Sequence, residues 1–205
     1  MTRKKSYNSN IEELRRIISN IQAAMQPGIK SILITSTLAR EGKTFITANL
    51  AKILADSRKK TLIIDFNLHR PGVHEFFKLI NSKGISDYLT TEIPLKDAIK
   101  ESKNNMLHFM LAGFQKVNFN TLLDSARCRE MFANLKEVYD YILIDSPAIS
   151  DSSDALVLAK YADTSIFVVQ AGKLDRKKVI RCKESLERVN PNILGVIVNK
   201  SGKYF

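Results

Sequence analysis

The amino-acid sequence predicts an α/β protein in which a mostly parallel β-sheet is flanked by helices. Short runs rich in Ile, Val and Leu recur along the chain and mostly lack polar alternation, as in strands that are buried on both faces. Segments with helical periodicity lie between these runs, and such alternation produces parallel sheets wrapped by helices. In addition, the loop after the first of these strands has the composition of a phosphate-binding loop.

The expected elements follow one another regularly along the chain. The expected strands cover residues 31–36, 61–66, 106–111, 141–146, 164–170 and 193–199. The expected helices between and after them cover residues 44–57, 73–80, 84–90, 94–102, 120–138, 152–161 and 175–189. No internal repeat and no low-complexity segment interrupts this order, so we expect a single sheet.

A further amphipathic helix over residues 11–25 is expected before the first strand, with Asn10 as its cap. Its apolar residues recur at spacings of three and four, at Ile11, Leu14, Ile18, Ile21 and Met25. A Pro-Gly pair follows and is expected to end the helix. We therefore divide the chain into an N-terminal helical appendage, residues 1–28, and a nucleotide-binding domain, residues 29–205.

Composition indicates one cytosolic domain. The chain has 205 residues, of which 44% are hydrophobic, which is enough for one well-buried core. Cys128 and Cys182 lack metal-ligand spacing and are expected to be reduced thiols without a catalytic role. The polar N-terminus and the absence of an apolar run of about 18 residues predict a cytoplasmic protein, at most peripheral to a membrane.

The net charge of +11 indicates an anionic partner, which is membrane headgroups, nucleic acid or the nucleotide itself. The basic clusters are short, and none is interleaved with aromatic residues as in a groove for single-stranded nucleic acid. We therefore expect no nucleic-acid partner.

The loop between the first strand and the following helix predicts a nucleoside triphosphate site. It ends in Glu41-Gly42-Lys43-Thr44, directly before the helix. Free N–H groups and the positive end of the helix dipole bind phosphate there, while Lys43 is expected to reach the outer phosphates and Thr44 to ligate Mg²⁺. The residues predicted to bind the nucleotide are Ser36, Arg40, Glu41, Gly42, Lys43, Thr44, Phe45 and Asn199.

Two apolar strands end in a carboxylate, Asp65 and Asp145. Ligands of parallel α/β sheets bind beyond the carboxyl ends of the strands, so both side chains are expected near the phosphate loop. Carboxylate oxygens suit Mg²⁺, and Asp65 is a further candidate for the base that accepts a hydroxyl proton. The predicted metal ligands are Thr44, Asp65 and Asp145, although each aspartate taken alone is equally consistent with a strand-end cap.

In this order the motifs resemble those of the bacterial tyrosine kinases of capsule and exopolysaccharide synthesis, P-loop proteins with a ParA/MinD-like architecture. The resemblance covers nearly the whole chain. Its motifs lie at residues 36–44, 65–71, 84–89, 111–113, 139–147, 154–155 and 192–199. It implies an ATP-dependent, Mg²⁺-dependent protein-tyrosine kinase that phosphorylates itself and other proteins on tyrosine.

The same resemblance implies partners and a location. In this family the cytoplasmic tail of a membrane chain-length regulator activates the kinase, which places the kinase in the cytoplasm, peripheral at the inner face of the membrane. The N-terminal helix is expected to join subunits of a homo-oligomer through a Glu-x-x-Arg-x-x-Arg motif. Here Glu12 and Arg15 are kept, and Ile18 replaces the second arginine.

The catalytic residues implied by the resemblance are Lys43, Asp65 and Asn67, and the last is a departure. The family has a second aspartate where this chain has Asn67. An amide cannot take a proton, so we expect weaker phosphotransfer than with an acid at this position. The family's tyrosine cluster is reduced to Tyr204, which is the expected phosphoacceptor.

Two alternatives stay open. The first is a catalytically weak nucleotide-binding regulator of the same machinery, which Asn67 and the reduced tyrosine cluster favour. The second is a ParA/MinD-type ATPase, but those proteins carry a lysine where this chain has Leu38. The three histidines show no metal-ligand spacing and are interpreted as loop or surface residues: His69, His74 and His108.

Overall fold

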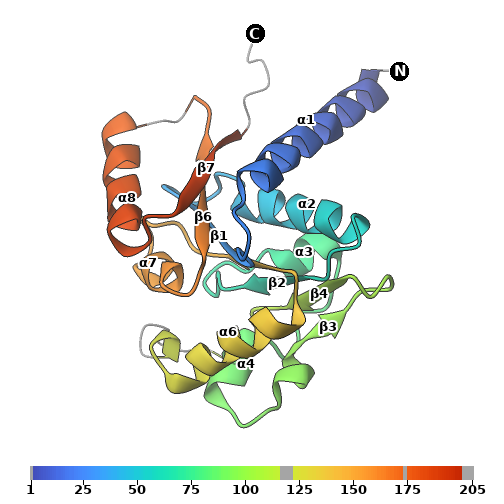
Figure 1. The fold of residues 1–205 in the computed structure, drawn as a ribbon, viewed down its shortest axis with the longest axis vertical. Helices are drawn as coiled ribbons and strands as arrows, with labels where there is room; N and C mark the ends of the chain where they lie inside the picture. The colour runs from blue at the N-terminus through green and yellow to red at the C-terminus, as the bar shows by residue number, and fades with distance from the viewer. Residues whose placement is uncertain (1, 116–121, 173–174, 200–205) are drawn as a thin grey trace.

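The computed structural model describes residues 2–115, 122–172 and 175–199. Its strands are β1 (Ser31–Ser36), β2 (Thr61–Asp65), β3 (Lys100–Glu101), β4 (Leu107–Met110), β5 (Tyr141–Asp145), β6 (Thr164–Gln170) and β7 (Ile193–Asn199). They form one seven-stranded sheet in the order β3-β4-β2-β5-β1-β6-β7 (Figure 1). All pairs are parallel except β3 with β4, which confirms the predicted mostly parallel sheet.

Helices connect the strands and cover both faces of the sheet. They are α1 (Thr2–Ala24), α2 (Lys43–Asp56), α3 (Val73–Phe77), α4 (Ile85–Thr90), the 3₁₀ helix η1 (Leu95–Ala98), α6 (Ala126–Val138), α7 (Asp154–Ala159) and α8 (Arg176–Val189). One hydrophobic cluster lies under α1, α2 and α3, and a second lies under α4, α6, α7 and α8. Figure 1 shows α1 and α2 together on one side of the sheet, with α6 and α4 on the other.

The strand pattern follows from burial on both faces. Along β1, Ile32 and Ile34 belong to the cluster under α2, whereas Leu33 between them belongs to the opposite cluster. All three side chains are buried completely. Strands of this kind have no polar face, which explains the absence of polar alternation in the sequence.

The N-terminal helix differs from the prediction at its start. It begins at Thr2 and therefore includes Asn10, which is not its cap, because no proline or glycine interrupts the helix before its end at Ala24. Ile18 and Ile21 are buried and pack in the same cluster as α2. The second half of α1 thus contributes to the hydrophobic core of the domain.

The expected helix over residues 94–102 is wrong. The chain forms only the short η1 there and then pairs Lys100 and Glu101 antiparallel to β4. Pro94 directly precedes η1, and the two residues of β3 gain their hydrogen bonds from a strand that follows later in the sequence. Local periodicity carries no information about such an edge pairing.

The order of the strands positions the site. The central strand β1 lies between β5 and β6, and β5 lies between β1 and β2. The loop after β1 therefore meets the ends of β2 and β5, where Asp65 and Asp145 lie opposite each other in register. No helix within the described part of the chain is both long enough and apolar enough to cross a membrane.

Candidate nucleotide-binding site

The side chain of Lys43, at the end of the loop between β1 and α2, reaches back to Ser36 at the start of the loop. Lys43 Nζ donates a hydrogen bond to Ser36 Oγ at 2.9 Å, and Ser36 Oγ donates to the carbonyl oxygen of Leu38 at 2.8 Å. Burial lowers the pKa of Lys43, while the charges of Asp145, Asp151 and Glu41 act in the opposite direction. The ammonium is thus fixed next to the loop that would surround the phosphates.

Glu41 and Asn199 brace this loop. The Glu41 carboxylate accepts hydrogen bonds from the main-chain N–H of Leu38 at 2.8 Å and of Gln170 at 3.2 Å. Asn199 Nδ2 donates to the Glu41 carbonyl oxygen at 2.9 Å. Gly42 has a φ of 100°, and a Cβ there would lie 1.9 Å from Asn199 Nδ2, so only glycine fits. Glu41 and Asn199, which were predicted to bind the nucleotide, therefore shape the phosphate loop.

Arg40 occupies a backbone conformation that favours glycine. Its φ is 63°, in the left-handed region, where a Cβ crowds the following carbonyl oxygen. Arg40 keeps the turn at a cost of about 1–2 kcal/mol of backbone strain.

This strain can be measured by comparing two substitutions. Both Arg40→Gly and Arg40→Ala remove the guanidinium, but only glycine tolerates the left-handed conformation without strain. We expect Arg40→Gly to be more stable than Arg40→Ala by about 1 kcal/mol in urea unfolding, because the strain exceeds the extra backbone entropy of glycine. Equal stability of the two variants, or greater stability of the alanine variant, would contradict the strained turn.

Thr44 and Asp145 form a pair at the start of α2. Thr44 Oγ1 donates to Asp145 Oδ2 at 2.6 Å. Asp145 Oδ1 is buried and has no hydrogen-bond partner among the described residues. Burial raises the pKa of the Asp145 carboxyl, and the hydrogen bond from Thr44 and the charge of Lys43 oppose this shift. An unpaired carboxylate oxygen beside a hydroxyl is a donor set that fits a hard cation such as Mg²⁺.

Asp65 is placed differently from Asp145. Its Oδ1 accepts from the main-chain N–H of Asn67 at 3.1 Å, and its Oδ2 accepts from those of Gly72 and Val73, each at 3.0 Å. Burial, and then the charge of Asp145, raise the pKa of this carboxyl. Asp65 thus closes the loop after β2 onto the start of α3, as a strand-end cap does.

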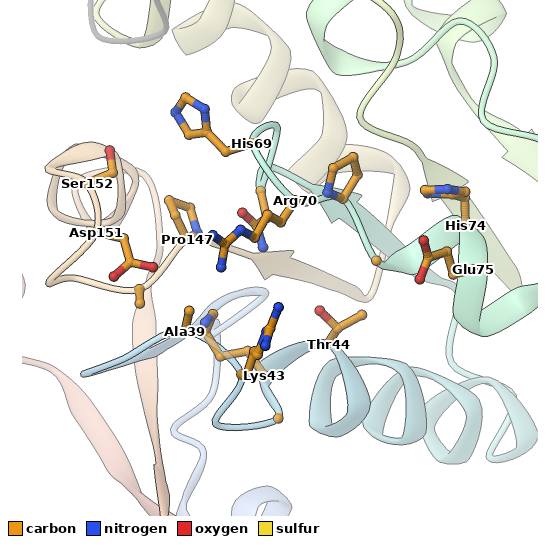
Figure 2. Close-up of a pocket in the computed structure, with 16 residues that line it drawn as sticks. Ala39, Lys43, Thr44, His69, Arg70, His74, Glu75, Pro147, Asp151 and Ser152 are labelled. Carbon is orange, nitrogen blue, oxygen red and sulfur yellow. The ribbon is translucent and has the colours of Figure 1, made fainter.

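A pocket of about 870 Å³ opens above the phosphate loop. Five residues predicted from the sequence line it: Arg40, Gly42, Lys43, Thr44 and Asn67. Six others do not line it: Ser36, Glu41, Phe45, Asp65, Asp145 and Asn199. Figure 2 shows Lys43 and Thr44 at the floor of the pocket, with Asp151 on one side and Glu75 on the other.

Comparison with known proteins identifies the family of the chain. The profile of the AAA domain matches residues 29–193. The tyrosine-protein kinase YwqD of Bacillus subtilis (strain 168) is 34% identical over 200 residues, which cover 97% of this chain and 84% of YwqD. The chain belongs to the bacterial tyrosine-protein kinases.

Solved structures agree with this assignment. The kinase domain of the Escherichia coli tyrosine kinase ETK superposes with a TM-score of 0.84 at 28% identity, covering 95% of this chain and 78% of that domain. The septum site-determining protein MinD of Pyrococcus horikoshii OT3, solved with Mg-ADP, superposes with a TM-score of 0.72 at 25% identity, covering 84% and 71%. The ParA/MinD-like fold class predicted from the sequence is thereby confirmed.

The pocket of this tyrosine-kinase family member is also lined by residues that were not predicted to bind the nucleotide or the metal. The additional lining residues are Ala39, His69, Arg70, Pro71, Gly72, His74, Glu75, Pro147, Ala148, Asp151 and Ser152. Most of them follow the two strands that end in aspartate, within seven residues of Asp145 or ten of Asp65. The polar residues that follow each strand-end aspartate in the sequence could have indicated these additional lining residues.

The prediction for one histidine is wrong. His108 lies on β4 and is buried, with Nδ1 at 2.8 Å from the Tyr139 hydroxyl, so it is not a loop or surface residue. Its partner lies 31 positions later in the sequence, and spacing alone could not reveal the pair. Cys128 and Cys182 are free thiols, as predicted, and both are buried.

Proposed function

We propose that the protein is an ATP-dependent protein-tyrosine kinase that transfers the γ-phosphate of Mg-ATP to tyrosine side chains, including its own. The observation that carries this proposal is the convergence of Lys43, Thr44 and Asp145 at the start of α2. Membership of the bacterial tyrosine-protein kinases supports the tyrosine as acceptor.

In the proposed mechanism the loop binds the phosphates. The N–H groups at the start of α2 and the positive end of its dipole face phosphate oxygens, and Lys43 neutralises the outer phosphates. Thr44 and Asp145 would hold Mg²⁺, and Asp65, which lies opposite Asp145 in the register of the sheet, is the third proposed ligand. When bound, Mg²⁺ neutralises charge on the phosphate oxygens. We further propose that Ser36, Glu41 and Asn199 support nucleotide binding by shaping the loop. Arg40 and Phe45 are proposed to contact the nucleotide at the edges of the loop.

The phosphoacceptor in this proposal is Tyr204, which lies outside the described residues. Tyr139 is a poor acceptor, because its side chain is only 4% exposed and its hydroxyl lies against His108. Burial raises the pKa of Tyr139 to about 12, which further disfavours its ionisation. We propose that other proteins are phosphorylated on tyrosine as well.

We further propose that the kinase regulates capsular or extracellular polysaccharide synthesis and export. A membrane chain-length regulator would activate it through a cytoplasmic tail and would hold it at the inner face of the membrane. The basic charge of the chain supports a position beside anionic headgroups.

Incubation of the purified protein with Mg-ATP, with and without the cytoplasmic tail of a candidate adaptor, tests the proposal. Detection of phosphotyrosine that increases with the tail is the expected result. Absence of phosphotyrosine under both conditions would favour the second candidate, a nucleotide-binding regulator of the same machinery. That candidate is supported by Asn67, which lines the pocket where the family has an acid.

The N-terminal helix leads to a prediction about assembly. Glu12 and Arg15 are exposed on α1, whereas Ile18 is only 2% exposed and packs in the core of its own chain. A side chain that is buried in this way cannot replace an arginine in contacts between subunits. We therefore expect a monomer in dilute solution by light scattering. A stable homo-oligomer in dilute solution would show that the arginine that Ile18 replaces is dispensable.

A further inference from the structure

Helix α8 carries a concentration of positive charge that the nucleotide pocket does not use. It contains six basic and two acidic residues, a net charge of +4, and of the two acids only Glu184 is exposed. Within the described chain the pocket is lined by the loops after β1, β2 and β5 and by α2 and α3, and α8 contributes no residue to it. The charge of α8 is therefore available to a different anionic partner.

Contacts along α8 determine which of its sides faces solvent. At its start, Asp175 Oδ1 accepts a main-chain N–H of the first turn at 3.2 Å. Cys182 and Leu186 are buried in the hydrophobic cluster under the helix. After its end, Asn190 Nδ2 donates to two carbonyl oxygens, at the end of α7 and just after it, at 3.0 and 2.8 Å. The opposite side of α8 is thus held outward, at the periphery of the molecule in Figure 1.

The solvent side of α8 combines basic residues with an exposed apolar side chain. Ile180 is 45% exposed, and Arg176 and Lys177 lie one helical turn before it, on the same side of the helix. Within the described chain, the ion pair that α8 forms joins Lys183 to Glu187. The exposed basic residues of α8 form no ion pair with any described residue; they are Arg176, Lys177, Lys178, Arg181 and Arg188.

This combination fits the surface of an anionic bilayer better than a nucleic acid. Both kinds of partner attract Lys and Arg. Surfaces for single-stranded nucleic acid add aromatic side chains on which bases stack, and α8 contains no aromatic residue. The exposed aliphatic side chain of Ile180 instead suits the boundary between lipid headgroups and acyl chains. Clusters of four to eight basic residues on a helix are typical of surfaces that bind anionic lipid.

We propose that α8 binds the anionic headgroups of a phospholipid bilayer directly. Lys177 and Arg181 lie one turn apart at the centre of this contact, and Ile180 enters the interface beside them. The inference rests on the proposed position of the protein at the inner face of the membrane, and it adds a contact with lipid to the proposed contact with an adaptor. Because α8 contributes no residue to the pocket, lipid binding requires no change at the nucleotide site.

Sedimentation with phospholipid vesicles, without nucleotide, tests this contact. The vesicles contain phosphatidylcholine alone or phosphatidylcholine with about 30 mol% phosphatidylglycerol. We expect binding to the anionic vesicles that weakens as salt screens the charges, and little binding to the neutral vesicles. Lys177→Glu/Arg181→Glu is expected to bind at least about tenfold more weakly than the parent, and Ile180→Ser about threefold more weakly. Arg58→Glu/Lys59→Glu makes the same change of charge at exposed residues between α2 and β2, and this control is expected to bind within about twofold of the parent.

Circular dichroism and thermal unfolding check that the variants keep the fold. Equal binding of Lys177→Glu/Arg181→Glu and the parent to anionic vesicles would overturn the proposal, and so would equal binding of the parent to neutral and anionic vesicles. Binding to an oligonucleotide of random sequence, without binding to either kind of vesicle, would assign α8 to nucleic acid and would overturn it as well. A protein that binds anionic vesicles through α8 and forms no phosphotyrosine would support this contact and refute the kinase function alone.

Discussion

The variant Lys43→Met is expected to bind ATP about 100-fold more weakly than the parent, with the fold intact. The ammonium is the cation at the floor of the pocket that the loop fixes, through its hydrogen bond to Ser36. Its loss removes a charge-assisted contact with the outer phosphates. Methionine has a similar length, and Ser36 keeps its own hydrogen bond to Leu38, so the loop retains its support.

Isothermal titration calorimetry with Mg-ATP checks this result, and circular dichroism with thermal unfolding checks the fold. Lys59→Met is a suitable control, since Lys59 is exposed between α2 and β2 and does not line the pocket. Equal affinities of Lys43→Met and the parent would mean that the phosphate-loop assignment is incorrect.

The largest gain of activity is expected from Asn67→Asp. Asn67 lines the pocket, and its main-chain N–H already bonds to Asp65, so an aspartate at this position needs no rearrangement of the loop. A carboxylate there adds negative charge and a proton acceptor to the pocket. We expect phosphotyrosine formation to increase by about tenfold or more.

Mass spectrometry of the Asn67→Asp products also tests the acceptor. Phosphate is expected mainly on Tyr204 and not on the buried Tyr139. Asn67→Ser, which lines the pocket with a small neutral side chain, controls for a change of volume and is expected to give no increase. A rate of Asn67→Asp equal to that of the parent, or phosphate on Tyr139 but not on Tyr204, would contradict this assignment of the site.

The regular part of the fold is predictable from the sequence. The strands β1, β2, β5 and β6 are apolar on both faces, and each corresponds to an uninterrupted apolar run. The edge strand β3 is not predictable, because its two residues depend on hydrogen bonds with β4. The start of α1 is not predictable either, because apolar periodicity begins only at Ile11, whereas the helix begins at Thr2.

The floor of the site is predictable in the same way, and its walls are not. Lys43 and Thr44 are defined by a short local motif at the start of a helix. Asp65 and Asp145 look alike in the sequence, but one caps a loop and the other pairs with Thr44, because the backbone after each strand folds differently. Asp151 carries no motif at all, and its place in the wall of the pocket arises only from the tertiary fold.

The proposed kinase function requires that this phosphate loop serves transfer of phosphate to tyrosine. The most direct test follows ATP labelled in its γ-phosphate, incubated with the protein and Mg²⁺, and measures how the label divides between phosphotyrosine and free phosphate. A tyrosine kinase places label on tyrosine, and the Lys43→Met variant abolishes that labelling. Release of all label as free phosphate would indicate an ATPase of the ParA/MinD type, and retention of all label in bound ATP would indicate a nucleotide-binding regulator. Either result would contradict transfer of phosphate to tyrosine at this loop.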